Sequence, residues 1–422
     1  MANSAGALPT VLFIGYAGIP NGFARVIKSL LESLAHILPR YGLHQLAINL
    51  TFAESMEQRG WTVHGNSGTL HNAETLVGLL RQVQPAIVVI VDVPWVCAER
   101  VDAIEASSSA RIVCYCAIDD SESLPPAVLQ KLARAHCLVA FTRFARGLLL
   151  QGFCEIGIEQ PPPVEVIPHG VDTSVFHPVV SAANLQESRQ LSCLSARRRL
   201  FGNDQRARDF IVLNANRNQP FKRIDIALEG FTLFAKDKPD SVMLYLHMAS
   251  RAPAPGETPL VDRLNIRRRI LTTTREELHP HVDDIVLNTI YNACDVGMNT
   301  SEKEGWGLIA FEHGATGAPQ LVPDHGACAE LWQGSALLLD AAAETSSVLN
   351  GRAVLTVTPE AVAHALELLY QDRQEREHWG EAAFNNANRP EYRWNAIAAR
   401  WDRLLSNLLA GAAGSVNNLT QT

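Results

Sequence analysis

The sequence lacks the features that would point to a membrane or to a metal held by cysteine. No apolar run reaches the roughly 20 residues of a membrane-spanning helix, and the start MANSAGALPTVLFIG has no signal-peptide pattern. The eight cysteines include no CxxC pair. Cys114, Cys116, Cys137 and Cys294 lie in apolar runs, which favours buried, reduced thiols over disulfides or zinc. We therefore expect a cytoplasmic protein without a membrane span.

Basic residues are also fewer than acidic ones, with 36 Lys and Arg against 44 Asp and Glu. The formal net charge of -8 at pH 7 argues against a protein that binds phosphate backbones through clustered Lys and Arg. Local basic stretches remain at residues 197–199 and 267–269. Each can be a solvated helix face or a surface that docks an acceptor. No nucleic-acid partner is expected.

Short apolar runs alternate with helix-like segments along the chain. Buried strands are predicted at 11–16, 85–93, 111–119, 137–142 and 164–170, and the pattern restarts at 209–219 and 241–249. Helical stretches are expected around 260–271 and over 289–301. This rhythm over 422 residues predicts an α/β fold of two Rossmann-like, doubly wound parallel-sheet domains that face a cleft.

The restart of the pattern sets the expected domain boundaries. We expect an N-terminal domain over 1–178, a linker or helical segment over 179–208 and a second domain over 209–388. A last amphipathic helix and a frayed tail, 389–422, are expected to pack back on the N-terminal domain. Trp394 and Trp401 stand seven residues apart in this helix, so we interpret them as packing anchors.

Two loops could hold phosphate. GYAGIPNGFARV places Gly15, Gly18 and Gly22 between a strand and a helix, as in a phosphate loop or a tight turn, but its spacing is not GxGxxG. In NANRNQPFKRID, Arg217 and Lys222 follow the end of a strand. Two cations there can neutralise a pyrophosphate, or can simply belong to a solvated loop.

The segment EKEGWGLIAFEHG carries two carboxylates, Glu304 and Glu312. Gly305 and Gly307 free the backbone before a helix that we expect to begin near Leu308. Eight helical steps rise about 12 Å, so one carboxylate could accept hydrogen bonds from a sugar and the other from a ribose. Acids near a helix start are also favourable without any ligand.

Three segments, in this order, resemble the retaining glycosyltransferases of the GT-B fold, specifically family 4. VIPHGVDTSVF is similar to that family's interdomain segment, NRNQPFKRID to its R-x4-K element, and SEKEGWGLIAFEHGATGAP to its E-x7-E motif. The resemblance covers nearly the whole chain. It implies a hexosyltransferase-like enzyme (EC 2.4), with an acceptor-side first domain and a donor-side second domain. Such an enzyme moves a sugar from a nucleotide-diphosphate donor to an acceptor, which could be a glycan, a lipid-linked molecule or a small molecule.

The resemblance also implies roles by position. Arg217 and Lys222 would hold the donor diphosphate, Glu312 the ribose and Glu304 the transferred sugar, while Asp119 would lie near the reacting hydroxyl. The implied catalytic residues are Asp119, Arg217, Lys222 and Glu304, and the implied donor-binding residues are Gly22, Asn216, Arg217, Lys222, Glu304, Gly305, Trp306, Gly307, Leu308 and Glu312. No cofactor is implied, and no metal, because Arg, Lys and backbone amides supply the positive potential.

The chain departs from the family pattern at two places. Ile118 and Asp119 stand where many relatives have a His, so Asp119 could orient the sugar or act as a base. Asp324, His325 and Gly326 replace a common Gly-Gly turn, which leaves the choice of sugar open. Two alternatives remain: a non-catalytic GT-B-like protein that binds nucleotide sugars, and a GT-B epimerase. The sequence leaves the nucleotide, the acceptor, the linkage and the oligomeric state undetermined.

Overall fold

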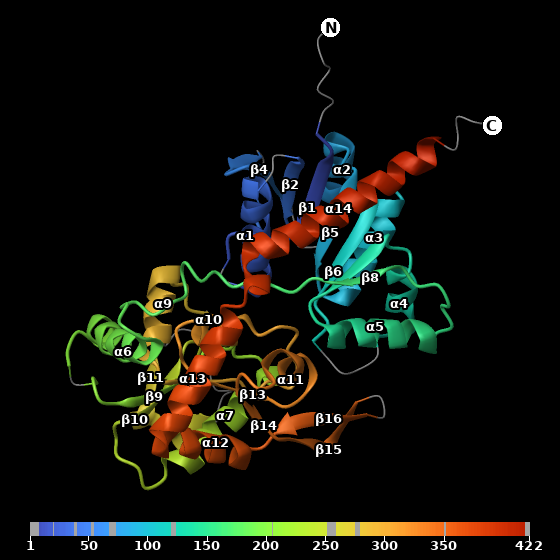
Figure 1. Cartoon of the computed structure of the whole chain (residues 1–422). Helices are drawn as coiled ribbons and strands as arrows, with labels where there is room; N and C mark the ends of the chain where they lie inside the picture. The colour runs from blue at the N-terminus through green and yellow to red at the C-terminus, as the bar shows by residue number, and fades with distance from the viewer. Residues whose placement is uncertain are drawn as a thin grey trace. The chain divides into compact units, whose positions relative to one another are not determined.

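The structure is a computed structural model of the chain. It describes residues 8–19, 21–37, 40–51, 55–66, 73–119, 124–204, 206–250, 259–274, 279–349 and 352–417. The chain divides into two compact units (Figure 1). Unit 1 comprises Met1–Ile118, Glu122–Gly170 and Glu391–Thr422, and unit 2 comprises Asp119–Ser121 and Val171–Pro390.

Unit 1 is built on a sheet whose described strands run in the order β3-β4-β2-β1-β5-β6-β7-β8. These strands are β1 (Thr10–Gly15), β2 (Gly42–Ala47), β3 (Met56–Gln58), β4 (Trp61–Gly65), β5 (Ile87–Asp92), β6 (Arg111–Cys116), β7 (Cys137–Ala140) and β8 (Val164–Val166). All neighbours pair in parallel except β3 with β4. Every residue of β5 is buried, as expected for a central parallel strand covered on both faces.

Helices cover this sheet. They are α1 (Gly22–Ile37), α2 (Ala73–Val83), α3 (Pro94–Glu105), α4 (Pro126–Leu132), α5 (Arg143–Glu155) and α14 (Trp394–Asn417). The last helix, red in Figure 1, packs on α1 and on the sheet. Trp401 is fully buried, with ring centroids 6.2 Å from Phe13 on β1 and 5.0 Å from Tyr115 on β6. Tyr41 adds a hydrogen bond to the Asp402 carboxylate at 2.7 Å.

Unit 2 contains a parallel sheet in the order β11-β10-β9-β12-β13-β14 and a separate antiparallel hairpin, β15-β16. The strands are β9 (Phe210–Asn214), β10 (Val242–Leu246), β11 (Ile270–Thr272), β12 (Val296–Met298), β13 (Gln320–Pro323), β14 (Leu337–Leu339), β15 (Ala341–Leu349) and β16 (Arg352–Val357). The helices are α6 (Leu185–Phe201), α7 (Ile224–Ala235), α8 (Leu260–Arg263), α9 (Asp284–Ala293), α10 (Leu308–Gly314), α11 (Gly326–Trp332), α12 (Pro359–Gln371) and α13 (Arg373–Ala387), with 3-10 turns η1 (Pro220–Lys222), η2 (Arg267–Arg269) and η3 (Pro390–Tyr392), the last at the boundary with unit 1.

The predicted α/β fold with two parallel-sheet domains is confirmed. Two local predictions were wrong. Within 260–271 the helical elements are the short α8 and the 3-10 turn η2, and β11 begins at Ile270. The helix expected over 289–301 ends at Ala293 and gives way to β12. The strand β12 has three residues, and a run that short carries no periodicity to distinguish it from a helix. The strands β2 and β4 and the hairpin β15-β16 were not predicted.

The basic and thiol side chains are placed partly as expected. All eight cysteines are free thiols, and all but Cys154 are buried. The 197–199 stretch is not a uniformly solvated face, because Arg197 is 3% exposed. The 267–269 stretch is a single 3-10 turn. Within the described ranges no helix has the length and apolar character needed to cross a membrane.

Candidate functional site

Most of the predicted donor residues lie in the loops that follow β9 and β12 of unit 2. These strands pair in parallel, with Val212 opposite Val296 and Leu213 opposite Gly297. Parallel neighbours end at the same edge of a sheet, so the loop after Asn214 lies beside the loop after Met298. Polar groups at the carboxyl ends of parallel strands are the usual ligand-binding position in such sheets.

Lys222 and Glu304 contact each other directly. The Lys222 Nζ donates to the Glu304 Oε2 at 2.9 Å, and the two side chains are 12% and 16% exposed. The Lys222 Nζ also lies 3.3 Å from the Lys303 carbonyl oxygen. Removing either member of an ion pair this sheltered would leave the other as a charge with little access to solvent. The sequence predicted a ligand for each residue but not this contact.

Side-chain and main-chain contacts hold the two loops in register around that pair. The Thr300 hydroxyl donates to the carbonyl oxygens of Lys222 and Arg223 at 3.1 and 2.9 Å. The Glu302 amide donates to the Phe221 carbonyl at 2.9 Å, and the Glu302 carboxylate pairs with Arg223. Arg223 itself has a φ of 46°, in the left-handed region. The turn that presents Lys222 is therefore fixed by at least four contacts to the loop carrying Glu304.

Two asparagines extend the network from β9 to Glu304. The Asn216 side-chain amide donates to the Asn299 Oδ1 at 3.3 Å, and the Asn299 Nδ2 lies 3.4 Å from the Glu304 Oε2. Both asparagines are buried. With Glu304 and Gly307 they line a cavity of about 10 Å³, which has room for about one water. Asn299 was missed from the sequence, although a polar residue directly after an apolar strand was a usable signal.

Arg217 stands at the exposed end of this group. In the described part of the chain its side chain makes no ion pair or hydrogen bond, and it is exposed. Burial lowers the pKa of His279, and the positive charge of Arg217 lowers it further. Arg217 is therefore close to His279. Its guanidinium has five N–H donors, and within the described ranges no carboxylate of the protein pairs with it.

Glu312 lies on α10, the helix that follows the loop carrying Glu304. It is buried, and its Oε2 accepts a hydrogen bond from the Tyr291 hydroxyl at 2.9 Å. The helix begins only at Leu308, so Glu304 belongs to the preceding loop. We expected eight continuous helical steps between Glu304 and Glu312. This was wrong, because the chain between Glu304 and Leu308 is not helical. Tyr291, which positions the Glu312 carboxylate, was not predicted.

The glycines between the two carboxylates have a backbone role. Gly307 precedes α10 with a φ of 81°, in the left-handed region that an L side chain rarely adopts. Trp306 is buried and stacks on Phe311 with ring centroids 4.9 Å apart. Its indole therefore belongs to the core, and any ligand contact of this residue runs through its backbone. Gly305 is buried and Leu308 half-buried.

Two predicted residues follow strands of the other sheet. Gly22 begins α1, and the Asn21 side chain caps that helix by accepting from the Ala24 amide at 2.7 Å. Asn49, after β2, exchanges two hydrogen bonds of 2.8 Å with the backbone of Ala17, which fixes the glycine loop. Asp119 follows β6, is half-buried, and groups with unit 2.

A buried histidine next to Glu312 makes stability depend on pH. Burial first, and then the Arg189 charge, lowers the pKa of His313 from 6.5 to about 3. The unfolded chain therefore binds more protons than the folded chain between pH 6.5 and 3, so the free energy of unfolding falls as the pH falls through that window. At pH 5 the expected loss from this one residue is about 2 kcal/mol relative to pH 7.

Urea unfolding at pH 7 and pH 5 checks this prediction. His313→Leu is expected to flatten the pH dependence by about 2 kcal/mol, whereas His378→Leu, at an exposed position, should leave it unchanged. Equal pH dependence in the His313→Leu variant and the wild type would show that His313 does not stay neutral by burial.

The two parallel-sheet units define the class: the fold is that of the GT-B glycosyltransferases. No family model matches the chain. The chain is 29% identical over 164 residues to mannosylfructose-phosphate synthase of Agrobacterium fabrum. This match covers 39% of this chain and 33% of that protein. It is 23% identical over 255 residues to D-inositol 3-phosphate glycosyltransferase of Corynebacterium glutamicum, covering 59% of this chain and 53% of that protein. The matched part thus spans between a third and about half the length of these relatives.

Solved structures resemble the fold over most of its length. Sucrose-phosphate synthase from Thermosynechococcus elongatus has a TM-score of 0.72 at 15% identity, covering 96% of this chain and 100% of that chain. The Anabaena protein HepE, solved in complex with UDP and glucose, has a TM-score of 0.67 at 17% identity, covering 94% of this chain and 100% of that chain. At these identities the likeness establishes the fold alone.

Proposed function

We propose that this chain is a metal-independent, retaining glycosyltransferase that resembles family 4 and uses a nucleotide-diphosphate sugar. The observation that carries the proposal is the Lys222–Glu304 ion pair of 2.9 Å at the carboxyl edge of the unit 2 sheet, with the exposed Arg217 on the same loop. The fold supports it, because its solved neighbours include proteins named as complexes with UDP and glucose, UDP-glucose and UDP-2-fluoro glucose. UDP-glucose is accordingly the first donor to test.

In the proposed reaction, the acceptor oxygen attacks the anomeric carbon from the face that the diphosphate leaves. The carbon–oxygen bond to the diphosphate breaks, the new glycosidic bond forms, and the acceptor's proton passes to a phosphate oxygen. Arg217 and Lys222 stabilise the negative charge that develops on the leaving group. Glu304 accepts hydrogen bonds from sugar hydroxyls, and through its ion pair it positions Lys222.

Two further residues complete the proposed site. Glu312, held by the Tyr291 hydroxyl, accepts hydrogen bonds from the ribose. Asp119 either orients the transferred sugar or takes part in proton transfer. Asp119→Asn separates these roles, because the amide keeps hydrogen bonding and loses basicity.

Nucleotide release from a donor panel tests the function. UDP-glucose, GDP-mannose and ADP-glucose would each be incubated with the full chain, with and without acceptors. The relatives are named for phosphate-bearing molecules, so fructose 6-phosphate and inositol 3-phosphate lead the acceptor panel. The proposal predicts acceptor-dependent UDP release and a glycoside of retained configuration. Binding without release from any donor would indicate a non-catalytic protein, and isomerised donor without transfer would indicate an epimerase.

Metal removal should leave the activity nearly unchanged. Arg217 and Lys222 are the cations that face the diphosphate in this proposal, in the place that a divalent ion has in other transferases. Transfer rates measured in excess EDTA and in excess Mg²⁺ are expected to agree within about two-fold. A loss in EDTA that Mg²⁺ restores would overturn the metal-independent mechanism.

A further inference from the structure

A second cavity lies in unit 2, at the opposite edge of the same sheet. Its volume is about 440 Å³, within the range of small-molecule sites. It lies between α6 and α13, at the amino ends of β9, β12 and β13, whereas Lys222 and Glu304 follow carboxyl ends. The lining includes five arginines and three acids: Arg189, Arg197, Arg208, Arg373, Arg376, Asp295, Glu377 and Glu381.

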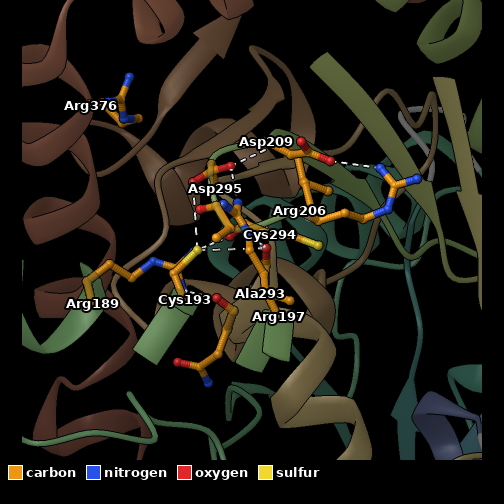
Figure 2. Close-up of polar contacts among 12 residues, drawn as sticks. Arg189, Cys193, Arg197, Arg206, Asp209, Ala293, Cys294, Asp295 and Arg376 are labelled. Atoms are coloured by element: carbon orange, nitrogen blue, oxygen red, sulfur yellow. Dashed lines mark hydrogen bonds and ion pairs between the residues drawn. The ribbon is translucent and has the colours of Figure 1, made fainter. Parts of the chain in front are cut away.

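Two of these arginines form ion pairs with acids of the lining, Arg197 in the interior and Arg373 at the surface. Arg197 donates to the Asp295 carboxylate at 2.6 Å and to the Ala293 carbonyl oxygen at 2.9 Å (Figure 2). It also donates to the Ala207 carbonyl oxygen at 3.1 Å. Arg373 pairs with Glu377 at 2.6 Å. In the described residues Arg189, Arg208 and Arg376 form no ion pair. The cavity therefore has an excess of positive charge.

Arg189 is the innermost of the three. Figure 2 shows it reaching from α6 beside Cys193 toward the chain that precedes β12. Its guanidinium donates to the Asn292 carbonyl at 2.9 Å and to the Cys294 carbonyl. Burial lowers the pKa of Arg189 and the Arg197 charge lowers it too, while Asp295, which is paired with Arg197, opposes the shift. Within the described residues Arg189 itself has carbonyl partners and lacks a carboxylate partner that would supply a compensating negative charge. An anion in the cavity would supply that charge.

The other two arginines extend the positive surface. Arg376, on α13, donates to the Leu369 and Tyr370 carbonyl oxygens and lies 5.8 Å from the Phe210 ring centroid. Arg208 is exposed and makes no hydrogen bond or ion pair in the described part of the chain. Guanidinium forks match phosphate oxygens in geometry as well as in charge.

The remaining residues that line the cavity suit a small molecule that is partly apolar and partly hydroxylated. Leu185, Leu194 and Pro319 contribute apolar surface, and the Gln186 amide donates to Glu381 at 3.2 Å. Amide and carboxylate groups of this kind can accept hydrogen bonds from ligand hydroxyls. We propose that this cavity binds a small organic phosphate with a hydroxylated body, and that binding stabilises the end of α9.

The expected effect on α9 follows from what Arg189 holds. The Cys294 carbonyl that accepts from Arg189 lies 3.4 Å from the His313 Nε2, next to Glu312 on α10. Tyr291, in the last turn of α9, donates to Glu312. An anion that fixes Arg189 would make opening of this turn rarer, so its amides should exchange more slowly.

Calorimetric titration of the full chain with glucose 6-phosphate, glucose and inorganic phosphate tests the site. Glucose 6-phosphate is expected to bind at least about ten-fold more tightly than either fragment. Arg208→Ala and Gln190→Glu should each weaken it about ten-fold, because one removes an exposed cation and the other adds a carboxylate to the lining. Arg268→Ala, at an exposed position outside the cavity, should bind normally.

Several outcomes would overturn the proposal. No binding of glucose 6-phosphate to the wild type would do so, as would affinity that survives in both variants, since the ligand would then occupy another site. Equal affinity for inorganic phosphate and glucose 6-phosphate would show that the site does not recognise the hydroxylated part of the ligand. Hydrogen exchange should slow at residues 284–294 when glucose 6-phosphate is bound to the wild type; unchanged exchange there would remove the stabilisation of α9. None of these measurements depends on sugar transfer.

Discussion

Lys222→Ala is expected to lower kcat/KM for transfer from UDP-glucose by about 10²–10³-fold, the usual effect of removing one preorganised donor to a developing negative charge. The Lys222 ammonium is held beside Glu304 by hydrogen bonds that fix both loops, so no neighbouring cation can move into its place without rearrangement. Removal also leaves the sheltered Glu304 carboxylate without its ion pair. The variant should therefore lose transfer while unit 2 stays folded.

Initial rates and circular dichroism on the same preparations check this result. Lys236→Ala removes an exposed lysine after α7 and should transfer sugar at the wild-type rate. Glu304→Gln combined with Lys222→Ala should be little worse than Lys222→Ala alone, because the two residues act as one unit. Near-normal turnover in Lys222→Ala would remove Lys222 from the proposed mechanism.

Trp401→Ala is expected to lower the free energy of unfolding of unit 1 by about 3–5 kcal/mol. The indole is fully buried and packs edge-on against Tyr115 of β6 and near Phe13 of β1. Its removal opens a cavity where the last helix meets the sheet, and backbone on both sides restricts collapse. A change of this size is a large part of the stability of an ordinary domain.

Urea titration followed by circular dichroism measures this loss. Trp95→Ala is the matched control, because Trp95 lies on α3 of the same unit and is 53% exposed; its effect should stay within about 0.5 kcal/mol. A Trp401→Ala variant as stable as the control would show that α14 contributes little to unit 1.

The architecture could be predicted because buried parallel strands are apolar on both faces. Residues 87–92 and 210–214 are almost continuous apolar runs, and such runs are typical of strands that are covered on both faces of a sheet. The prediction failed where elements are short. β11 and β12 have only three residues each, which is less than one helical turn and too short to distinguish a strand pattern from a helical one.

The sequence allowed candidate site residues to be named, but not the contacts among them. The spacing of Arg217, Lys222, Glu304 and Glu312 could be recognised, yet the Lys222–Glu304 contact depends on the pairing of β9 with β12. A contact between loops 82 residues apart in sequence cannot be read from either loop. Asn299 and Tyr291 were missed for the same reason, since their roles come from their neighbours in space.

The second cavity could not be predicted from the basic stretches of the sequence. Residues 197–199 suggested a solvated basic face, but the helix turns Arg197 inward to Asp295 and leaves Arg198 and Arg199 exposed. One residue in a helix rotates by about 100°, so adjacent arginines can have opposite environments. Arg376 comes from a helix remote in sequence, and only the fold brings it to the same cavity as α6.

The most direct test of the proposed donor site is a calorimetric titration of UDP into the wild type, Arg217→Ala and Glu312→Gln, with Lys236→Ala as the control. The account predicts that UDP binds the wild type and the control equally, and that each of the other two variants binds it about 10–100-fold more weakly, because each loses a hydrogen bond to a charged group. UDP affinity unchanged in both Arg217→Ala and Glu312→Gln would contradict the placement of the nucleotide at this edge of the sheet.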